Sequence, residues 1–212
     1  MNKRTNGVEM LSTLIDFYPK NKCELEFSSD YELLVAVILS AQCTDKRVNL
    51  VTKELFAVAN TPEKMINLRI ERLKEIIKPC GFFNNKAKSI INASASLIEK
   101  FNSIVPKTRE ELLSLSGVGE KTASVVLAVA FGVPAIAVDT HVFRLSKRLG
   151  LANKKTPIET MYALEKIIPK DMWIDGHFAL VLHGRYVCKA QRPLCCDCLI
   201  KDRCPSYKKF IK

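Results

Sequence analysis

Four cysteines near the C-terminus have a spacing that is typical of metal ligands. They form the pattern Cys188-x6-Cys195-x2-Cys198-x5-Cys204. Four thiols this close together in a cytosolic protein indicate a metal site. Structural zinc and iron–sulfur clusters both take four cysteines, and the spacing alone leaves the choice between them open. Cys196 is out of step with the other four, and we interpret it as a non-ligand.

Basic residues lie between these cysteines. Lys189 and Arg192 stand in the first interval, and Lys201 and Arg203 stand in the last. A metal bound at residues 188–204 would hold these side chains in place, where they can contact the phosphates of a nucleic acid. The alternative is that the charges only keep the loop soluble.

Two glycines within three residues form the second candidate site. Residues 112–123 read LLSLSGVGEKTA, in which Gly117, Val118 and Gly119 separate two apolar segments. Glycines permit a tight turn here, and the free amides that begin the next helix would bind an anion such as a DNA phosphate. We therefore predict a helix-hairpin-helix element over about 108–132, with Val118 in the core. A plain helix–helix turn with a glycine C-cap is the alternative.

Lys121 follows these glycines and lies on the first turn of the predicted second helix. The helix dipole disfavours a cation at this end, which favours the neutral amine that a nucleophile needs. The competing roles for this side chain are a contact to phosphate and an ordinary solvated lysine.

Asp139 ends an apolar stretch and begins a helix that carries Val142, Leu145 and Leu149 on one side. Its simplest role is that of an N-cap. A carboxylate near an amine can also accept a proton and stabilise the positive charge that develops at a reacting sugar carbon. The separation of Lys121 and Asp139 along the chain does not show that they meet.

The segments around these candidates are typical of a globular, all-α protein. Of the 212 residues, 48% are hydrophobic, which is enough for a sizeable core. Apolar residues recur at helical spacing in most windows, without the sustained alternation of strands, so we expect about ten short helices. Residues 31–41 are apolar nearly all round and predict a helix that is buried on every side.

Capping signals predict where several helices begin. Thr44 and Thr61, the latter before Pro62, are predicted single N-caps. Thr108 with Glu111 and Thr156 with Glu159 are predicted capping boxes. One further helix should start at Asn84 or Asn85.

The chain carries 33 Lys and Arg against 22 Asp and Glu, a net charge of +11. This surplus favours a polyanionic partner, because each neutralised phosphate releases counterions; a basic protein without a nucleic-acid role is the alternative. The longest apolar stretch, residues 33–39, is too short to span a membrane, and the N-terminal MNKRTNGVEM lacks the apolar run of a secretory signal. We therefore expect a cytoplasmic monomer with reduced cysteines and no membrane partner.

Together these features resemble the bacterial endonuclease III family, the iron–sulfur branch of the helix-hairpin-helix DNA glycosylase superfamily. The resemblance covers residues 9–205 and is carried by the cysteine loop and by LSAQCTD (39–45), LSGVGEKTA (115–123), AVDTHVFR (137–144) and LHGRYVC (182–188). It implies a bifunctional enzyme of base excision repair that binds double-stranded DNA with damaged bases or abasic sites. Such an enzyme removes oxidised pyrimidines and cleaves abasic sites through a lysine Schiff base and β-elimination.

The resemblance also assigns roles to individual residues. Lys121 takes the place of the family's nucleophile, and Asp139 that of its catalytic aspartate. Gln42 takes the place of the glutamine that fills the gap left by the flipped nucleotide. A 4Fe-4S cluster would be bound by Cys188, Cys195, Cys198 and Cys204. The other expected DNA contacts are Gly117, Val118, Gly119, Lys189 and Arg192.

The family's architecture implies two helical lobes with a DNA cleft between them. Residues 23–133 would form a six-helix lobe that contains the hairpin. Residues 1–22 and 134–212 would form a second, discontinuous lobe that ends in the 4Fe-4S cluster loop. Asp139 would then face Lys121 across the cleft.

The sequence departs from the family at a turn that often reads GLYN. Here the turn is Gly81-Phe82-Phe83-Asn84, so Phe82 takes the place of the family's leucine wedge. An aromatic side chain can also insert between bases and stack on them. Phe82 is therefore the candidate wedge, and the preference for damaged bases can differ from that of relatives with leucine.

Two other functions compete with this one. A related adenine-mismatch glycosylase lacks a lysine nucleophile at the hairpin and has an additional C-terminal domain. A non-catalytic DNA-binding module would use the hairpin and the basic loop, but it would not need both Lys121 and Asp139. Such a module would not cleave abasic sites.

Overall fold

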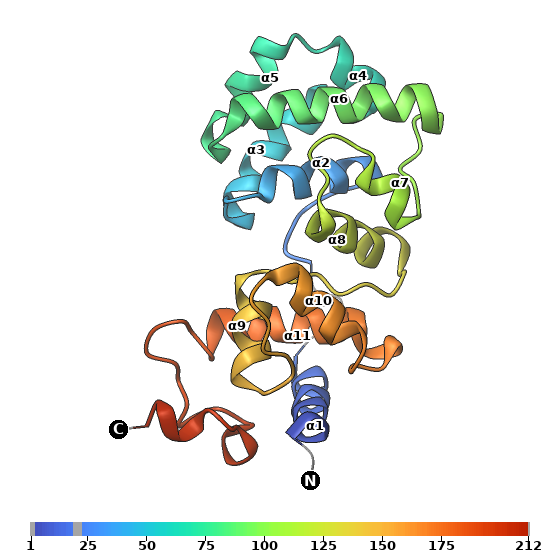
Figure 1. Ribbon diagram of the computed structural model, residues 1–212. Helices are drawn as coiled ribbons and strands as arrows, with labels where there is room; N and C mark the ends of the chain where they lie inside the picture. The colour runs from blue at the N-terminus through green and yellow to red at the C-terminus, as the bar shows by residue number, and fades with distance from the viewer. Residues whose placement is uncertain (1–2, 19–22, 212) are drawn as a thin grey trace. The chain divides into compact units, whose positions relative to one another are not determined.

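The computed structural model describes residues 3–18 and 23–211, and this part of the chain is helical without any strand (Figure 1). The predicted all-α fold is therefore confirmed. Contacts divide the structure into two compact units. One unit is Cys23–Gly132, and the other combines the described residues of Met1–Lys22 with Val133–Lys212. No helix within the described ranges is both long and apolar enough to cross a membrane.

The unit Cys23–Gly132 is organised around one hydrophobic helix, α2. Its residues 31–39 are all buried, as expected for a helix that is apolar on every side. Helix α2 packs against α3, α6 and α8. The α-helices of this unit are α2 (Asp30–Ser40), α3 (Asp45–Val58), α4 (Pro62–Asn67), α5 (Ile70–Ile77), α6 (Phe83–Phe101), α7 (Arg109–Leu113) and α8 (Glu120–Phe131), with a 3-10 turn, η1 (Lys78–Cys80), before α6.

The other unit packs its N-terminal helix against its C-terminal half. Helix α11 contacts both α1 and α9, and its apolar residues close a core with those of the two partners. The elements of this unit are α1 (Lys3–Phe17), α9 (Thr140–Arg148), α10 (Pro157–Glu165), η2 (Lys170–Met172), α11 (Trp173–Tyr186), η3 (Lys201–Arg203) and η4 (Tyr207–Lys209). Arg203 in η3 joins this C-terminal part to α1, because its carbonyl accepts from the Nδ2 of Asn6 at 3.0 Å and its Nη2 donates to the hydroxyl of Thr13 at 2.7 Å.

Most of the predicted caps are confirmed. Thr44, Thr61 and Thr156 each accept a hydrogen bond from the first turn of the following helix, and Thr156 forms a complete capping box with Glu159. Before α7 only half of the expected box is present. The hydroxyl of Thr108 accepts from the N–H of Glu111 but donates to the Glu111 carboxylate at 2.6 Å.

The predicted start of α6 at Asn84 or Asn85 is wrong. The helix begins at Phe83, and the residue that precedes it is Phe82, whose backbone is left-handed with φ 48°. Gly81 before it also has a positive φ, 69°. Phe82 is therefore the N-cap, and Asn84 and Asn85 lie within the first turn of the helix.

Candidate functional site

The glycine turn joins α7 to α8 as a helix-hairpin-helix. Gly117 has φ 78°, and a Cβ at this position would lie 2.6 Å from the Cβ of Ser89. Only glycine meets both demands. Val118 is buried and anchors the turn, and its N–H donates to the carbonyl of Leu115 at 3.2 Å.

Gly119 is the N-cap of α8 and has no side chain with which to cap it. A Cβ at Gly119 would meet no atom within 4 Å, so the approach to the first amides of the helix is open. Free amides together with the positive end of the dipole make this turn suitable for binding an anion.

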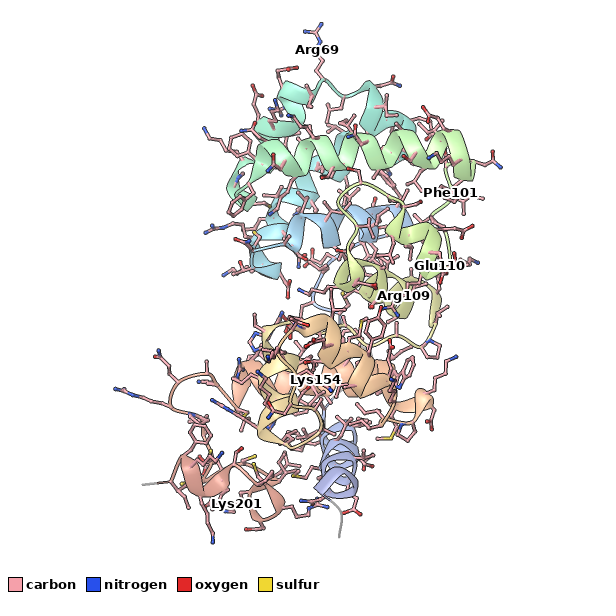
Figure 2. The ribbon with its side chains drawn as sticks, viewed as in Figure 1. Arg69, Phe101, Arg109, Glu110, Lys154 and Lys201 are labelled. Atoms are coloured by element: carbon pink, nitrogen blue, oxygen red, sulfur yellow. The ribbon has the colours of Figure 1, made fainter. Side chains whose placement is uncertain are left out.

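An ion pair braces the two helices of the hairpin. Arg109 of α7, labelled in Figure 2, contacts the same carboxylate oxygen of Glu120 through Nε and Nη2, each at 2.7 Å. The side chains are 27% and 25% exposed, so water screens this pair less than a surface pair. Glu120 is also the first residue of α8, where the helix dipole favours a negative charge. The brace fixes the end of α8 that carries Lys121.

Lys121 is the second residue of α8, and its side chain is exposed. The side chain is therefore accessible to a ligand that is bound at the glycine turn. Asp139 lies in the other unit, directly after the buried residues 135–138. It is the N-cap of α9, as the simplest interpretation of its sequence predicts, and it is half-buried. The two residues belong to different units, and the pairing of Lys121 with Asp139 stays a prediction.

Gln42 and Phe82 share an unusual backbone conformation. Their φ angles are 53° and 48°, in the left-handed region that non-glycine residues rarely adopt. Both side chains are exposed, and that of Phe82 is 64% exposed. Such conformations each cost about 1–3 kcal/mol and are concentrated at functional sites. An exposed phenylalanine on a strained turn has the form expected of a wedge.

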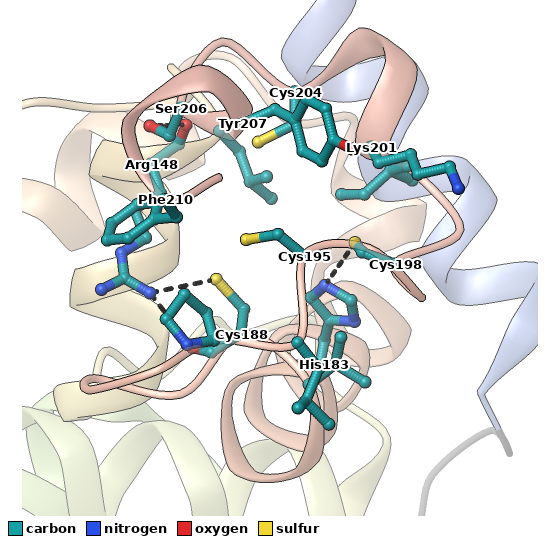
Figure 3. A pocket seen from close by; sticks show the side chains of 15 residues that line it. Arg148, His183, Cys188, Cys195, Cys198, Lys201, Cys204, Ser206, Tyr207 and Phe210 are labelled. Atoms are coloured by element: carbon teal, nitrogen blue, oxygen red, sulfur yellow. Dashed lines mark hydrogen bonds between the residues drawn. The ribbon is translucent and has the colours of Figure 1, made fainter. Parts of the chain in front are cut away.

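The four predicted ligand cysteines line one cavity, and Figure 3 shows their side chains around it. The cavity is partly open to solvent. Its walls are largely apolar and include Leu149, Val187, Leu194, Ile200 and Phe210. Cys196 is exposed and is not among the lining residues. Within the described residues, no three His, Cys, Asp or Glu side chains are placed to hold one metal ion.

Arg148 binds the first part of the cysteine loop. Its Nη1 donates to the Sγ of Cys188 at 3.3 Å and to the carbonyl of Lys189 at 2.7 Å, and its Nη2 donates to the carbonyl of Ala190 at 3.0 Å. The guanidinium also lies over the ring of Phe210, 4.4 Å from its centre. The periodicity of the sequence did not indicate Arg148, because its partners lie about 40 residues away along the chain.

His183 lies on another side of the same cavity. Its Nε2 is 3.5 Å from the Sγ of Cys198, and its Nδ1 is 3.0 Å from the hydroxyl of Tyr18. Burial lowers the pKa of His183 to about 4, so the ring is neutral at pH 7. Burial is also the main factor that raises the pKa of the Cys198 and Cys204 thiols. Thiolates at these positions therefore need a positive partner.

Lys189 and Arg192, the predicted phosphate contacts, are exposed. Arg192 has φ 46°, which marks a sharp bend between Cys188 and Cys195. Arg144 fixes the start of this bend, because its Nε donates to the carbonyl of Cys188 at 3.1 Å and its Nη2 to that of Gly184 at 2.9 Å. Gly184 lies in the last turn of α11, so the guanidinium also complements the dipole of this helix.

Several known proteins of DNA repair are similar to this chain. Residues 35–170 match the family described as HhH-GPD superfamily base excision DNA repair protein. Endonuclease III of Haemophilus influenzae is 48% identical over 212 residues, which is 100% of each chain. A solved structure of a non-covalent endonuclease III–DNA complex has a TM-score of 0.92 at 46% identity, over 99% of this chain and 98% of that one. A trapped endonuclease III–DNA covalent intermediate matches with the same values.

Proposed function

The chain belongs to the endonuclease III family of the HhH-GPD superfamily, and on that premise we propose that it is a bifunctional DNA glycosylase and abasic-site lyase. The substrate is double-stranded DNA that contains oxidised pyrimidines or abasic sites. The observation that carries the proposal is the position of Lys121, an exposed amine one residue into a helix whose N-cap is an open glycine turn. A relative of 46% identity has been trapped as a covalent intermediate with DNA, which supports a nucleophile of this kind.

Lys121 is the proposed nucleophile. Its neutral amine attacks the sugar C1′ of the damaged nucleotide, and the bond to the base breaks as the base takes up a proton released by the amine. The C1′–O4′ bond of the sugar ring then opens, which leaves a protonated Schiff base between the lysine nitrogen and C1′ and a hydroxyl at C4′. Loss of a proton from C2′ then allows β-elimination, which cleaves the strand on the 3′ side. Asp139 is the proposed acceptor of protons, and its negative charge stabilises the positive charge that develops on the sugar.

The hairpin and the two strained turns hold the DNA in this proposal. Amides at Gly117 and Gly119 bind a phosphate without reading sequence. The damaged nucleotide leaves the stack, which the reaction requires because C1′ is not accessible within an intact duplex. Gln42 and Phe82 then fill the vacated space, and their exposure on left-handed turns supports this role.

The cysteine loop is the proposed site of a 4Fe-4S cluster, held by Cys188, Cys195, Cys198 and Cys204. The donor set fits, because four cysteines surround one cavity with apolar walls and Arg148 donates a hydrogen bond to one of the sulfurs. A bound cluster would supply a structural link between the two ends of the loop. Lys189 and Arg192 lie on the segment that it would close, and they would contact the DNA backbone.

A single experiment tests this function. The protein is incubated with duplexes that contain thymine glycol or an abasic site, with and without borohydride. We expect release of the base, cleavage on the 3′ side of the lesion, and a covalent protein–DNA product only when borohydride is present. Binding without cleavage on both duplexes would instead indicate a non-catalytic DNA-binding module.

A further inference from the structure

Lys86 is a buried lysine for which the proposed reaction has no use. Its side chain lies on α6 and is only 6% exposed, although lysine is almost never buried without a partner. The ammonium donates to two backbone carbonyls, those of Leu39 and Cys80, each at 2.9 Å. Burial lowers the pKa of Lys86, while the nearby thiols of Cys80 and Cys43 act in the opposite direction.

Both carbonyls belong to the ends of helical segments. Leu39 lies in the last turn of α2, and Cys80 is the last residue of η1. Carbonyls at a C-terminal end have no partner within the helix and carry a partial negative charge. An ammonium between two such ends offsets part of the free energy that is lost when its charge is buried.

The two proposed DNA-inserting residues lie two or three positions after these carbonyls. Gln42 comes three residues after Leu39, and Phe82 comes two residues after Cys80. Both residues have a positive φ, so each turn depends on what holds the backbone before it. Burial and then the neighbouring Cys43 thiol raise the pKa of Cys80, so the two turns are also close to each other at these thiols.

We propose that Lys86 is a positioning residue that ties the Gln42 turn to the Phe82 turn, so that both side chains enter the duplex as one unit. This inference rests on the proposed function of those two residues. A methionine of similar length would fill the same volume but would leave both carbonyls without a donor. The two turns would then be held only by their weaker remaining contacts.

The proposal predicts different effects on the reaction with duplex DNA and on the reaction with a single strand. Excision from a duplex needs the nucleotide to leave the stack and the gap to be filled, whereas an abasic site in a single strand needs much less of either. A defect in the two turns should therefore slow the reaction on duplex DNA and leave single-strand cleavage almost unchanged. A general loss of structure would slow both reactions equally.

The test uses Lys86→Met, with Lys88→Met as the matched control because Lys88 is an exposed lysine on the same helix. Rates are measured on a thymine-glycol duplex and on a single-stranded abasic oligonucleotide. We expect Lys86→Met to slow duplex excision by about tenfold or more, since two hydrogen bonds from a charged donor are lost. Single-strand cleavage should change by less than about twofold, and Lys88→Met should resemble the wild type on both substrates.

A second measurement uses Phe82→Ala. If Lys86 acts through the turns, Lys86→Met should slow duplex excision less in the Phe82→Ala protein than in the wild type. An equal fall on both substrates, an unchanged duplex rate, or full additivity with Phe82→Ala would overturn the proposal. Failure of both Lys86→Met and Lys86→Gln to fold, seen by circular dichroism, would also count against it and make Lys86 a core residue. A wild-type protein that cleaves neither substrate would contradict the proposed function itself.

Discussion

The Oδ1 of Asp139 accepts a hydrogen bond from the N–H of Val142 at 2.8 Å, so the proposed catalytic carboxylate is also the N-cap of α9. This bond fixes the side chain at the start of the helix and leaves the other carboxylate oxygen, Oδ2, for a second role. A cap and a proton acceptor make different demands on the residue, because an amide can replace a carboxylate in the first role only.

Asp139→Asn should therefore separate the two roles. Asparagine caps a helix as well as aspartate does, so the free energy of unfolding should change by less than about 0.5 kcal/mol. Loss of the negative charge should slow base excision by about a hundredfold or more. Denaturant unfolding and single-turnover excision measure the two effects. Asp139→Ala is the control, and it should lose about 1 kcal/mol of stability in addition.

The local sequence predicted this cap for a physical reason. A cap such as Asp139 or Thr156 depends on atoms three residues away, and a buried helix such as α2 depends only on the apolar character of its own residues. The start of α6 could not be predicted in the same way. The left-handed turn at Phe82 lies beside the carbonyl of Cys80, which a lysine from within α6 binds.

In the candidate sites, too, contacts between residues far apart along the chain could not be predicted from the sequence. The spacing of the four cysteines from Cys188 to Cys204 indicated a metal site, but the hydrogen bond from Arg148 to the Sγ of Cys188 joins residues that are 40 positions apart. The sequence gives one weak indication that Lys86 is buried. It lies four residues before the buried Ile90 and therefore on the apolar face of α6. A lysine on such a face is normally read as a side chain that reaches out to solvent.

Replacement of Lys121 by alanine should abolish the covalent complex with borohydride. Strand cleavage at abasic sites should fall by more than about a thousandfold, which corresponds to about 4 kcal/mol of transition-state stabilisation. Gel analysis of trapped products measures the first effect and single-turnover kinetics the second. Lys88→Ala removes a similar exposed charge and should trap normally.

The same variant distinguishes a nucleophile from a phosphate contact. If Lys121 only binds phosphate, trapping persists, affinity falls for all DNA sequences, and the salt dependence of binding decreases by about one charge. Persistent trapping in Lys121→Ala would thus refute the proposed nucleophile, whatever happens to affinity.

The two glycines of the hairpin should respond differently to alanine. Gly117→Ala should lower the free energy of unfolding by about 2–4 kcal/mol, because the residue has φ 78° and the new Cβ would meet Ser89. Gly119→Ala should cost about 1 kcal/mol or less, because its φ of −99° is ordinary and the added Cβ meets open space. Denaturant unfolding compares the two variants. Similar losses for both would mean that the turn adjusts its backbone to accept a side chain.

Adjacent cysteines in the loop provide the sharpest test of the cluster. Cys195 lines the cavity, whereas its neighbour Cys196 is exposed and does not. Cys195→Ser should remove one ligand and with it most of the visible absorption and the bound iron and sulfide. Cys196→Ser should leave both unchanged, which makes it a control that differs by a single position. The protein is purified without oxygen, and iron, sulfide and zinc are measured together.

Loss of the cluster should also weaken DNA binding, because two of the predicted phosphate contacts lie in the cysteine loop. Without the cluster, the segment that carries Lys189 and Arg192 keeps its hydrogen bonds to Arg144 and Arg148 but loses the link between its two ends, so affinity for duplex DNA should fall and its dependence on salt should weaken. Cys195→Ser should show this loss and Cys196→Ser should not, in binding measured over a range of salt concentrations. Stoichiometric zinc in the wild type would contradict the iron–sulfur assignment while leaving the predicted difference in DNA binding intact. Equal metal content in the two variants would show that Cys195 is not a ligand.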